Sequence, residues 1–350
     1  MNEHTTNAGS IPLPTRREPA GGRLLAEAFV SVARTPALCE SQRRVLLACE
    51  DGSSAEWTVR LLESDPALAI AVIYGAATAN RTRVASLRAA VERLGPTGVM
   101  TVVAAVPTYD PLNGHWAACI RYERFRRHAA STRAATELVA ALAGIEDVDG
   151  LLTAALLHDA GRLVLAELYG TALDSIEDGE LPEERLRRER LTFGTDHALV
   201  GAVAAGRWGL PATVASAVER HHAVDATGHP GAIRLGDLIA HHASGDPLAE
   251  ASLSGAARQL GLGPDDVRSV LFEFPLGDSR RENAPRPCPL SARELDALHG
   301  LSEGKVYKQI AGELSLSVST VRTHLHNVYR KTGAVDRAQA VLIARDAGWL

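Results

Sequence analysis

Apolar residues recur at helical spacing along most of the chain. The stretch VASLRAAVERLG, residues 84–95, places Leu, Ala and Val at intervals of three and four positions and ends on a glycine. Short breaks at clusters of Gly, Pro and Asp separate this stretch from similar ones. The run GVMTVVAAV, residues 98–106, fits a buried strand or a buried helix; we assign a helix because no neighbouring segment offers a paired strand.

Two segments depart from this pattern and divide the chain. Residues 1–22 are rich in Pro, Gly, Thr and Asn, which is typical of a mobile tail. The stretch EFPLGDSRRENAPRPCP holds four prolines and little apolar content, which favours a linker. We therefore expect an all-α protein with a tail at 1–22, a helical domain at 23–272, a linker at 273–288 and a small four-helix domain at 289–350.

The last domain contains the pattern of a helix-turn-helix. In IAGELSLSVSTVRTHLHNVYRKTG, residues 310–333, one helix is expected to end near Leu314, and Ser317 is a good N-cap for the next. Val318, Val321, Leu325 and Val328 fall on one face of that second helix. The other face and its flanks are small, polar or basic, and this set is Ser319, Thr320, Arg322, Thr323, His326 and Arg330. Such a face either enters the DNA major groove or is simply solvated.

A wider motif favours DNA binding. From residue 289 to the end, the sequence resembles the LuxR-type helix-turn-helix. The matching residues are Leu290, Arg293, Glu294, Leu301, Gly304, Ile310, Ala311, Leu314, Ser317, Thr320, Val321, Arg322, His324, Asn327, Lys331, Arg337 and Ala340. The resemblance implies a homodimer that regulates transcription on double-stranded DNA. It also implies that Thr320, Arg322 and Lys331 contact DNA and that the last helix, near 337–347, pairs with a second subunit.

The large domain contains a His-Asp pair, His158–Asp159, in the apolar run LLHDAGRLVLAE. Both side chains are costly to bury without partners. Similar polar residues interrupt other apolar helical segments, namely His128, His197, His221, His222 and Asp237. Imidazoles and carboxylates suit zinc, manganese or iron. The alternative is a hydrogen-bonded core histidine, which we assign to the remaining candidates His115, His229, His241, His242 and His299.

Three stretches give these residues a common context: LLESDPALAIAVIYGAATANRTRVASLRAAVERLG, AALLHDAGRLVLAELYG and FGTDHALVGAVAAGRWGLPATVASAVERHH. They resemble the HDOD domain of the HD superfamily of metal-dependent phosphohydrolases. Many HDOD domains have lost metal ligands, whereas this sequence keeps a nearly full set. The resemblance implies one or two divalent ions (Fe, Mn or Zn), with His128, His158, Asp159 and Asp237 binding the first.

The same resemblance assigns the rest of the site. Asp159 would bridge to a second ion held by His197, His221 and His222. In an enzyme, Asp159 and Arg162 would be catalytic; Arg162 stands where related enzymes often carry Lys. The alternative without metal is a hydrogen-bonded His/Asp cluster that survives from a catalytic ancestor.

Composition narrows the location and the partners. The net charge is −5, so any nucleic-acid contact must come from a local basic patch. The four cysteines are scattered and form no CxxC motif, so the sequence indicates neither a zinc ribbon nor a disulfide framework. No signal peptide or membrane-spanning run is apparent, so we expect a cytoplasmic protein without membrane contact.

We therefore expect a DNA-binding transcription regulator whose HDOD-like domain senses a metal or a phosphate-containing small molecule. One alternative is an active metal-dependent phosphohydrolase, acting on a nucleotide or cyclic nucleotide, with a regulatory DNA-binding domain. Another is an interaction scaffold whose large domain has neither ligand nor activity.

Overall fold

A computed structural model of the chain describes residues 22–110, 116–170, 182–246, 248, 250–274, 288, 290–314, 316–332, 334, 337–346 and 349. The predicted tail, except residue 22, and residues 275–287 of the predicted linker lie outside these ranges. Within them the chain is almost entirely helical, which confirms the all-α prediction. The one sheet found there is minimal: β1 (Ala37–Leu38) pairs in parallel with β2 (Thr108–Tyr109).

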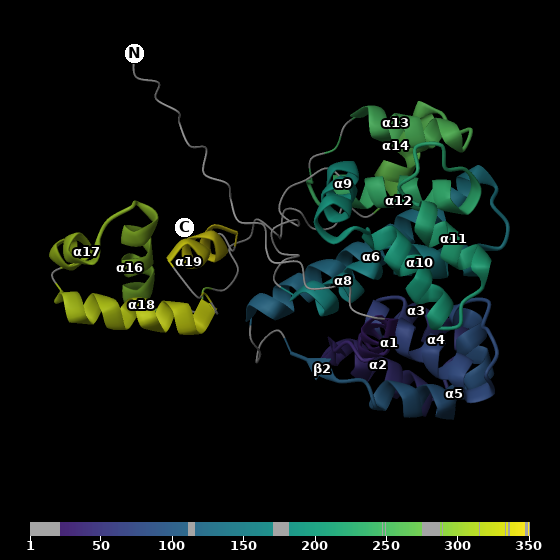
Figure 1. Cartoon of the computed structure of the whole chain (residues 1–350), viewed down its shortest axis with the longest axis horizontal. Coiled ribbons are helices and arrows are strands. Elements are labelled where there is room, and N and C mark those ends of the chain that lie inside the picture. The colour runs from purple at the N-terminus through teal and green to yellow at the C-terminus, as the bar shows by residue number, and fades with distance from the viewer. Residues whose placement is uncertain are drawn as a thin grey trace, which may run out of the picture.

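The large helical bundle runs from α1 to α14, and a second, smaller group runs from α16 to α19 (Figure 1). The helices of the bundle are α1 (Gly22–Val32), α2 (Cys39–Glu50), α3 (Ala55–Leu62), α4 (Pro66–Asn80), α5 (Leu87–Ala104), α6 (Trp116–Ala143), α7 (Val148–Leu157), α8 (Gly161–Tyr169), α9 (Pro182–Phe193), α10 (His197–Arg207), α11 (Ala212–Arg220), α12 (Gly228–Ala243), α13 (Glu250–Gln259) and α14 (Pro264–Glu273).

Helix α5 shows how the predicted breaks operate. It contains most of VASLRAAVERLG and of GVMTVVAAV, so the helical assignment of the second run is confirmed. The two parts meet at Gly95, which has a φ of 64°, a backbone conformation that glycine adopts without steric strain. Pro96 follows directly and cannot continue the first hydrogen-bond ladder. The apparent single helix is therefore two helices joined at a kink, with the first ending where the sequence predicts.

The centre of the bundle is α12, which packs along α6. Nearly every side chain of α12 from Gly231 to Ala243 is buried. Its contact with α6 requires a glycine, because a Cβ on Gly236 would lie 2.2 Å from the hydroxyl oxygen of Thr136 and 2.9 Å from its backbone nitrogen. This close approach fixes the next residue, Asp237, against α6.

A second close approach joins α8 to α10. A Cβ on Gly161 would lie 1.9 Å from the carbonyl oxygen of His197 and 2.6 Å from the backbone nitrogen of Gly201. Only glycine allows this crossing without a backbone shift. The crossing brings the turn that carries Asp159 against the first residue of α10, His197.

The small group has a core of its own, in which Leu298, Ile310, Val321, Leu325 and Val328 are buried. Its helices are α16 (Ala292–Ser302), α17 (Tyr307–Glu313), α18 (Val318–Thr332) and α19 (Arg337–Asp346). The core of the large bundle extends to Phe274. The first two residues of the predicted linker therefore belong to the bundle, because Glu273 ends α14 and Phe274 packs inside.

None of the helices in the described ranges combines the length and the apolar character needed to cross a membrane.

Candidate metal centre and nucleic-acid interface

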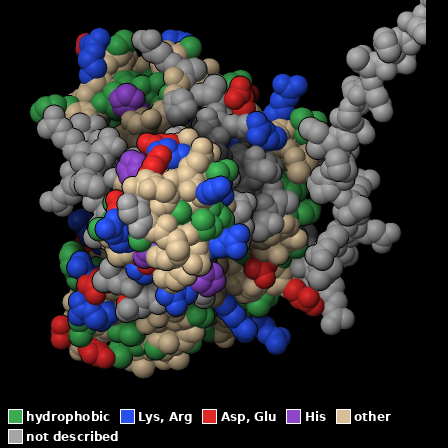
Figure 2. All heavy atoms as spheres, turned by 90° about the vertical axis from the view of Figure 1, so that its left-hand side faces the viewer, with side chains coloured by type: hydrophobic (Ala, Val, Ile, Leu, Met, Phe, Trp, Pro, Cys, Tyr) green, Lys and Arg blue, Asp and Glu red, His purple; other side chains and the backbone are tan. Residues whose placement is uncertain are grey.

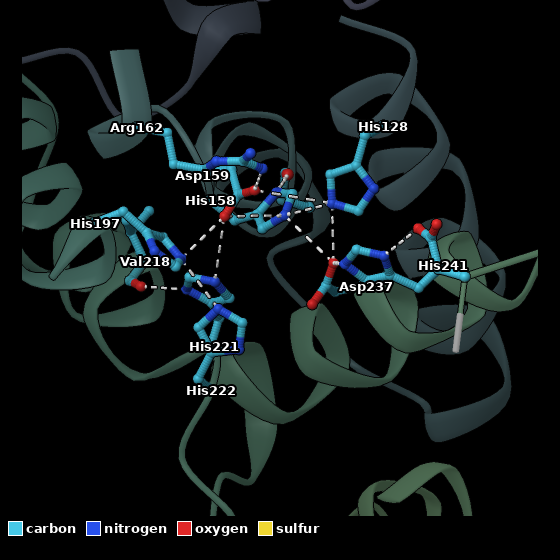
Figure 3. Close-up of polar contacts among 12 residues, drawn as sticks. His128, His158, Asp159, Arg162, His197, Val218, His221, His222, Asp237 and His241 are labelled. Carbon is cyan, nitrogen blue, oxygen red and sulfur yellow. Dashed lines mark hydrogen bonds and ion pairs between the residues drawn. The ribbon is translucent and has the colours of Figure 1, made fainter. Parts of the chain in front are cut away.

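The seven metal-type residues predicted from the sequence come together in the middle of the large bundle (Figure 3). His158 and Asp159 occupy the turn between α7 and α8, and both are buried. His128 comes from α6 and Asp237 from α12. The other three follow or begin helices: His197 is the first residue of α10, and His221 and His222 follow α11. The cluster therefore depends on five separate segments of the chain.

One half of the cluster surrounds Asp237. Its Oδ1 lies 3.0 Å from His128 Nε2 and 3.5 Å from His158 Nε2, and those two nitrogens are 3.2 Å apart. A third imidazole, His241, places Nε2 at 3.4 Å from the same oxygen. The first half therefore presents three imidazole nitrogens to one carboxylate oxygen.

The other half surrounds Asp159. Its Oδ1 lies 3.1 Å from His197 Nε2 and 3.8 Å from His221 Nε2, and His222 Nε2 is 3.1 Å from His197 Nε2. Its Oδ2 accepts a hydrogen bond from Arg162 at 3.0 Å and lies 4.0 Å from His128 Nε2. Asp159 therefore stands between the two halves, as Figure 3 shows.

Four imidazoles are anchored to the scaffold through Nδ1. The Nδ1 atom of His158 lies 2.8 Å from the carbonyl oxygen of Ala155. The Nδ1 atom of His221 lies 2.6 Å from the carbonyl oxygen of Val218. A carbonyl can only accept, so Nδ1 carries the proton there. The Nδ1 atoms of His197 and His241 lie 2.7 Å from Glu189 and Asp246 respectively. This anchoring turns Nε2 toward the cluster, as is usual for metal-ligating histidines.

Burial and mutual repulsion decide the charge of several members. Burial, reinforced by the neighbouring His241, lowers the pKa of His128 to about 4. Burial, reinforced by His158, lowers the pKa of His221 to about 3. Both imidazoles are therefore neutral and able to donate a lone pair at neutral pH. Burial acts on His197 in the same direction, but the carboxylates of Asp159 and Glu189 outweigh it and raise its pKa to about 9.

The carboxylates remain charged. Burial would raise the pKa of Asp159, but the adjacent His158 and His197 hold it well below its ordinary value. The pKa of Asp237 is lowered in the same way, against burial, by His241 and His128. A divalent ion requires ionised carboxylates and neutral imidazoles. The carboxylates, His128 and His221 meet this requirement, whereas a bound ion would have to displace a proton from His197.

The spacing of the donor atoms fits a shared ion. With metal–ligand bonds of about 2.1 Å, two ligand atoms of one ion are about 3.0 Å apart in octahedral and about 3.4 Å in tetrahedral geometry. The separations around Asp237 Oδ1, from 3.0 to 3.5 Å, match these values. Asp237 Oδ1 and His221 Nε2 are also buried without a hydrogen-bond partner. A divalent ion in each half of the cluster would satisfy these two atoms, so the residues fit the group.

Three members of the site escaped the sequence reading. His241 was assigned to the hydrogen-bonded core; it does hydrogen-bond Asp246, but it also faces Asp237. Its spacing of four residues from Asp237 on one helix was the signal that was available. Glu189 and Arg185 come from α9, whose charged sequence PEERLRRERLTF gave no sign that these two side chains are buried.

The other histidines lie away from the cluster. His242 and His299 are exposed, so the core assignment is wrong for both: their helices turn them to solvent. His229 is partly exposed and reaches only the carbonyl oxygen of Glu146, at 3.4 Å. His115 lies outside the described residues.

The predicted helix-turn-helix is formed by α17 and α18. Helix α17 ends at Glu313, and the hydroxyl of Ser317 accepts a hydrogen bond at 3.0 Å from the backbone nitrogen of Thr320, as expected of an N-cap. Val321, Leu325 and Val328 of α18 are buried. The predicted DNA-contacting side chains are exposed or partly exposed, namely Ser319, Thr320, Arg322, Thr323, His326, Arg330 and Lys331.

These side chains are not equally available. The ammonium of Lys331 lies 2.6 Å from a carboxylate oxygen of Glu294, which is buried and also accepts from the backbone nitrogen of Ser291. Lys331 therefore ties α18 to α16. Arg330 donates to Asn327 at 3.2 Å.

The surface around this unit is mixed in charge. On the side of the molecule shown in Figure 2, Lys and Arg side chains are scattered among Asp and Glu and form no continuous basic face. This agrees with the net charge of −5. On this side of the molecule there is thus no broad basic surface to which DNA could bind.

Two families match the chain. The HDOD domain matches residues 35–224, which is more than half of the chain. The luxR family of bacterial regulatory proteins matches residues 288–344. The first range contains six of the seven predicted metal-type residues, and the second contains the whole helix-turn-helix.

Curated relatives match the carboxy-terminal part. The probable transcriptional regulatory protein NarL of Mycobacterium tuberculosis is 40% identical over 79 residues, which is 23% of this chain and 37% of that protein. The transcriptional regulatory protein LiaR of Bacillus subtilis is 41% identical over 96 residues, which is 27% of this chain and 46% of that protein. The chain thus spans less than half the length of these relatives.

Solved structures share the fold of the large bundle. The MmoQ response regulator of Methylococcus capsulatus aligns with a TM-score of 0.54 at 23% identity, over 68% of this chain and 98% of that one. A virulence factor of Campylobacter jejuni aligns with a TM-score of 0.52 at 14% identity, over 74% of this chain and 97% of that one. The chain belongs to the HDOD family, and its carboxy-terminal part is a luxR-family helix-turn-helix domain.

Proposed function

We propose that the protein is a transcription regulator that binds double-stranded DNA through α18 and senses a metal ion or a small ligand in the HDOD domain. The exposed, small and basic face of α18, opposite its buried valines and leucine, carries the DNA-binding part. A helix of this kind fits the major groove, where Arg and Thr side chains reach base edges and phosphates. The names of the curated relatives, which are transcriptional regulators, support the same proposal.

The sensing part rests on the His/Asp cluster. His128, His158, Asp159 and Asp237 would hold one divalent ion, and Asp159, His197, His221 and His222 a second. We add His241 to the first set, because its Nε2 lies 3.4 Å from Asp237 Oδ1. Iron, manganese and zinc all accept this mixture of imidazole and carboxylate ligands.

The proposed separation of sensing and DNA binding into two domains rests on the two hydrophobic cores. One core lies between Ala28 and Phe274 and the other between Leu290 and Trp349. They support domains close to the ranges 23–272 and 289–350, joined by a linker at 273–288. Each domain can then fold around its own core, and ligand binding in one can bias the other.

We further propose that the regulator is a homodimer on DNA, because a two-fold DNA site is best met by a two-fold protein. Helix α19 is the proposed contact. Its Ala344 is buried within the domain and Val341 is half-buried. The side chains of Ala338 and Leu342, the other two apolar candidates, lie outside the described residues.

A second candidate function is phosphohydrolase activity. The observation that favours it is the position of Asp159 between the two halves, with Arg162 hydrogen-bonded to it. Two divalent ions would supply Lewis acidity toward a phosphoryl group. Arg162 would then neutralise phosphate charge while it holds Asp159 in place. Incubating the manganese-loaded protein with a panel of nucleotides and cyclic nucleotides tests this candidate, and absence of product release would exclude these substrates.

The test of the main proposal is DNA binding by the carboxy-terminal domain alone. Residues 288–350 should bind duplex DNA in a gel-shift or anisotropy titration, with affinity that falls as salt rises because phosphate contacts release counterions. A folded domain that binds no duplex from a random-sequence pool would contradict the DNA-binding part without touching the metal cluster.

A further inference from the structure

Arg185 of α9 is a buried arginine that has no counter-ion among the residues that the structure describes. The residue is only 8% exposed, and its Nε has no hydrogen-bond partner. It forms no ion pair with any residue in the described parts of the chain. A guanidinium stays protonated in proteins, so its charge cannot be removed by losing a proton. A buried charge of this kind is costly unless something compensates it.

The charge of Arg185 acts on the His/Asp cluster. The pKa of His241 is raised, because Asp237 and Asp246 outweigh both burial and the opposing charge of Arg185. The pKa of Asp246 is lowered, first by its hydrogen bond to His241 and in smaller part by Arg185. The pKa of Arg185 is itself lowered, by burial first and by the neighbouring Arg162 second, against the raising effect of Asp159 and Asp237. Its position agrees with this: Arg185 is buried one helical turn before Glu189, whose carboxylate lies 2.7 Å from His197 Nδ1, so α9 brings both side chains to the cluster side of the bundle.

The carboxylates of the cluster do not compensate Arg185 directly. Asp237 Oδ1 faces three imidazoles at 3.0 to 3.5 Å, and Asp159 Oδ2 accepts from Arg162 at 3.0 Å. Two arginines, Arg162 and Arg185, thus act on each other with like charge beside a candidate metal centre. Paired guanidiniums suit a tetrahedral oxyanion, whose oxygens each accept N–H donors from a planar fork.

We propose that Arg185, together with Arg162, binds a phosphate-type oxyanion of a small ligand beside the His/Asp cluster. The proposal rests on the proposed sensing function of this cluster and specifies the chemistry of what is sensed. The anion supplies the missing counter-charge to Arg185 and relieves its repulsion with Arg162. A bound anion would also explain why α9 carries a buried arginine one turn from Glu189, the residue that orients His197.

The experiment measures binding of inorganic phosphate to the full chain by calorimetry and thermal unfolding, with metal content determined on the same samples. Arg185→Gln is compared with Arg187→Gln, an exposed arginine of the same helix. Phosphate should bind to and stabilise the wild type and Arg187→Gln. Arg185→Gln should lower phosphate affinity by about tenfold or more. Without phosphate, Arg185→Gln should melt at the same or a higher temperature, because a buried uncompensated charge has been removed, and its metal content should be unchanged.

Several results would overturn the proposal. Equal phosphate affinity in Arg185→Gln and wild type would remove Arg185 from the site. Loss of binding in Arg187→Gln alone would place the anion instead in the pocket lined by Arg187, Arg220 and His222, which borders the cluster at His222. If Arg185→Gln does not fold, Arg185→Lys replaces it in the test, because lysine keeps the charge but lacks the planar guanidinium. Undiminished phosphate binding by Arg185→Lys would contradict the proposed role of the guanidinium. Phosphate binding that needs Arg185 in a protein without metal would refute the metal centre but retain this anion site.

Discussion

Four histidines of the cluster hold one ring nitrogen against the scaffold and turn the other toward two carboxylates. The sequence predicted the seven ligand-type residues because each interrupts an apolar helical segment. It could not show His241, Glu189 or Arg185 in the site, since their burial depends on how α9 and α12 pack. A side chain whose neighbours come from other helices leaves little trace in its own segment.

At this scale the first prediction concerns metal content. The wild-type protein should contain one to two ions of iron, manganese or zinc per chain and should melt at a lower temperature after treatment with a chelator. A ligand present at 100 times its dissociation constant stabilises the folded state by about 2.7 kcal/mol. His158→Ala and Asp159→Ala should abolish the chelator effect, whereas His299→Ala, at an exposed histidine, should preserve it. A wild type that is metal-free and insensitive to chelator would leave the hydrogen-bonded relic as the better explanation.

The second prediction concerns the glycine of the His-Asp turn. Gly161→Ala forces a Cβ into the carbonyl of His197 and must separate α8 from α10. Overpacking of this kind costs about 1–3 kcal/mol or more in unfolding free energy, measured by denaturant titration. Metal content should fall as well, because His197 moves away from Asp159. The control is Gly206→Ala on α10, where a Cβ meets nothing within 4 Å; similar losses in both variants would reject the close-approach argument.

At the scale of the element, α18 was the most predictable part of the chain. Its cap and most of its buried face follow from local spacing and agree with the structure, in which Val321, Leu325 and Val328 are buried. Val318, expected on the same face, is 37% exposed because it is the first residue of the helix. The role of Lys331 was less predictable, because its partner Glu294 lies 37 positions earlier on α16. Similarly, the two-residue strands β1 and β2 are joined by a pairing over 71 residues, which no local pattern indicates.

The third prediction belongs to α18. Arg322→Ala should weaken DNA binding by about 1–3 kcal/mol without changing the thermal stability of the domain, because this side chain is exposed. Arg293→Ala on α16, where the arginine is also exposed, serves as the control. Anisotropy titrations at two salt concentrations separate a base contact from a phosphate contact. Undiminished binding by a folded Arg322→Ala variant would take this residue off the interface.

At the scale of the whole molecule, the sequence located the two helical units from the Pro-rich break between them. It could not reveal how the five segments of the cluster converge, since they are separated by up to 109 positions and meet only through tertiary packing. The resemblance to the HDOD domain supplied that information. The separate cores explain why a DNA-binding module and a sensing module can coexist in one chain.

The fourth prediction concerns assembly. Light scattering of the full chain with a specific duplex should give two chains per site, through α19. Val341→Asp should reduce the stoichiometry to one and lower the affinity, since a charge at a half-buried apolar position opposes pairing. Circular dichroism of the free variant checks that it remains folded. One wild-type chain per specific site would argue against a dimer.

The central claim is that the His/Asp cluster and the DNA-binding helix are parts of one regulator. The most direct measurement is the affinity of the full chain for a duplex selected by residues 288–350, determined for the metal-loaded and the chelator-treated protein at one salt concentration. We predict that the two affinities differ by about 5- to 150-fold, the usual range of coupling between sites. Asp159→Ala should remove the difference, and the isolated domain should show none. Equal affinities of the loaded and stripped full chain, with metal loading verified, would contradict the account.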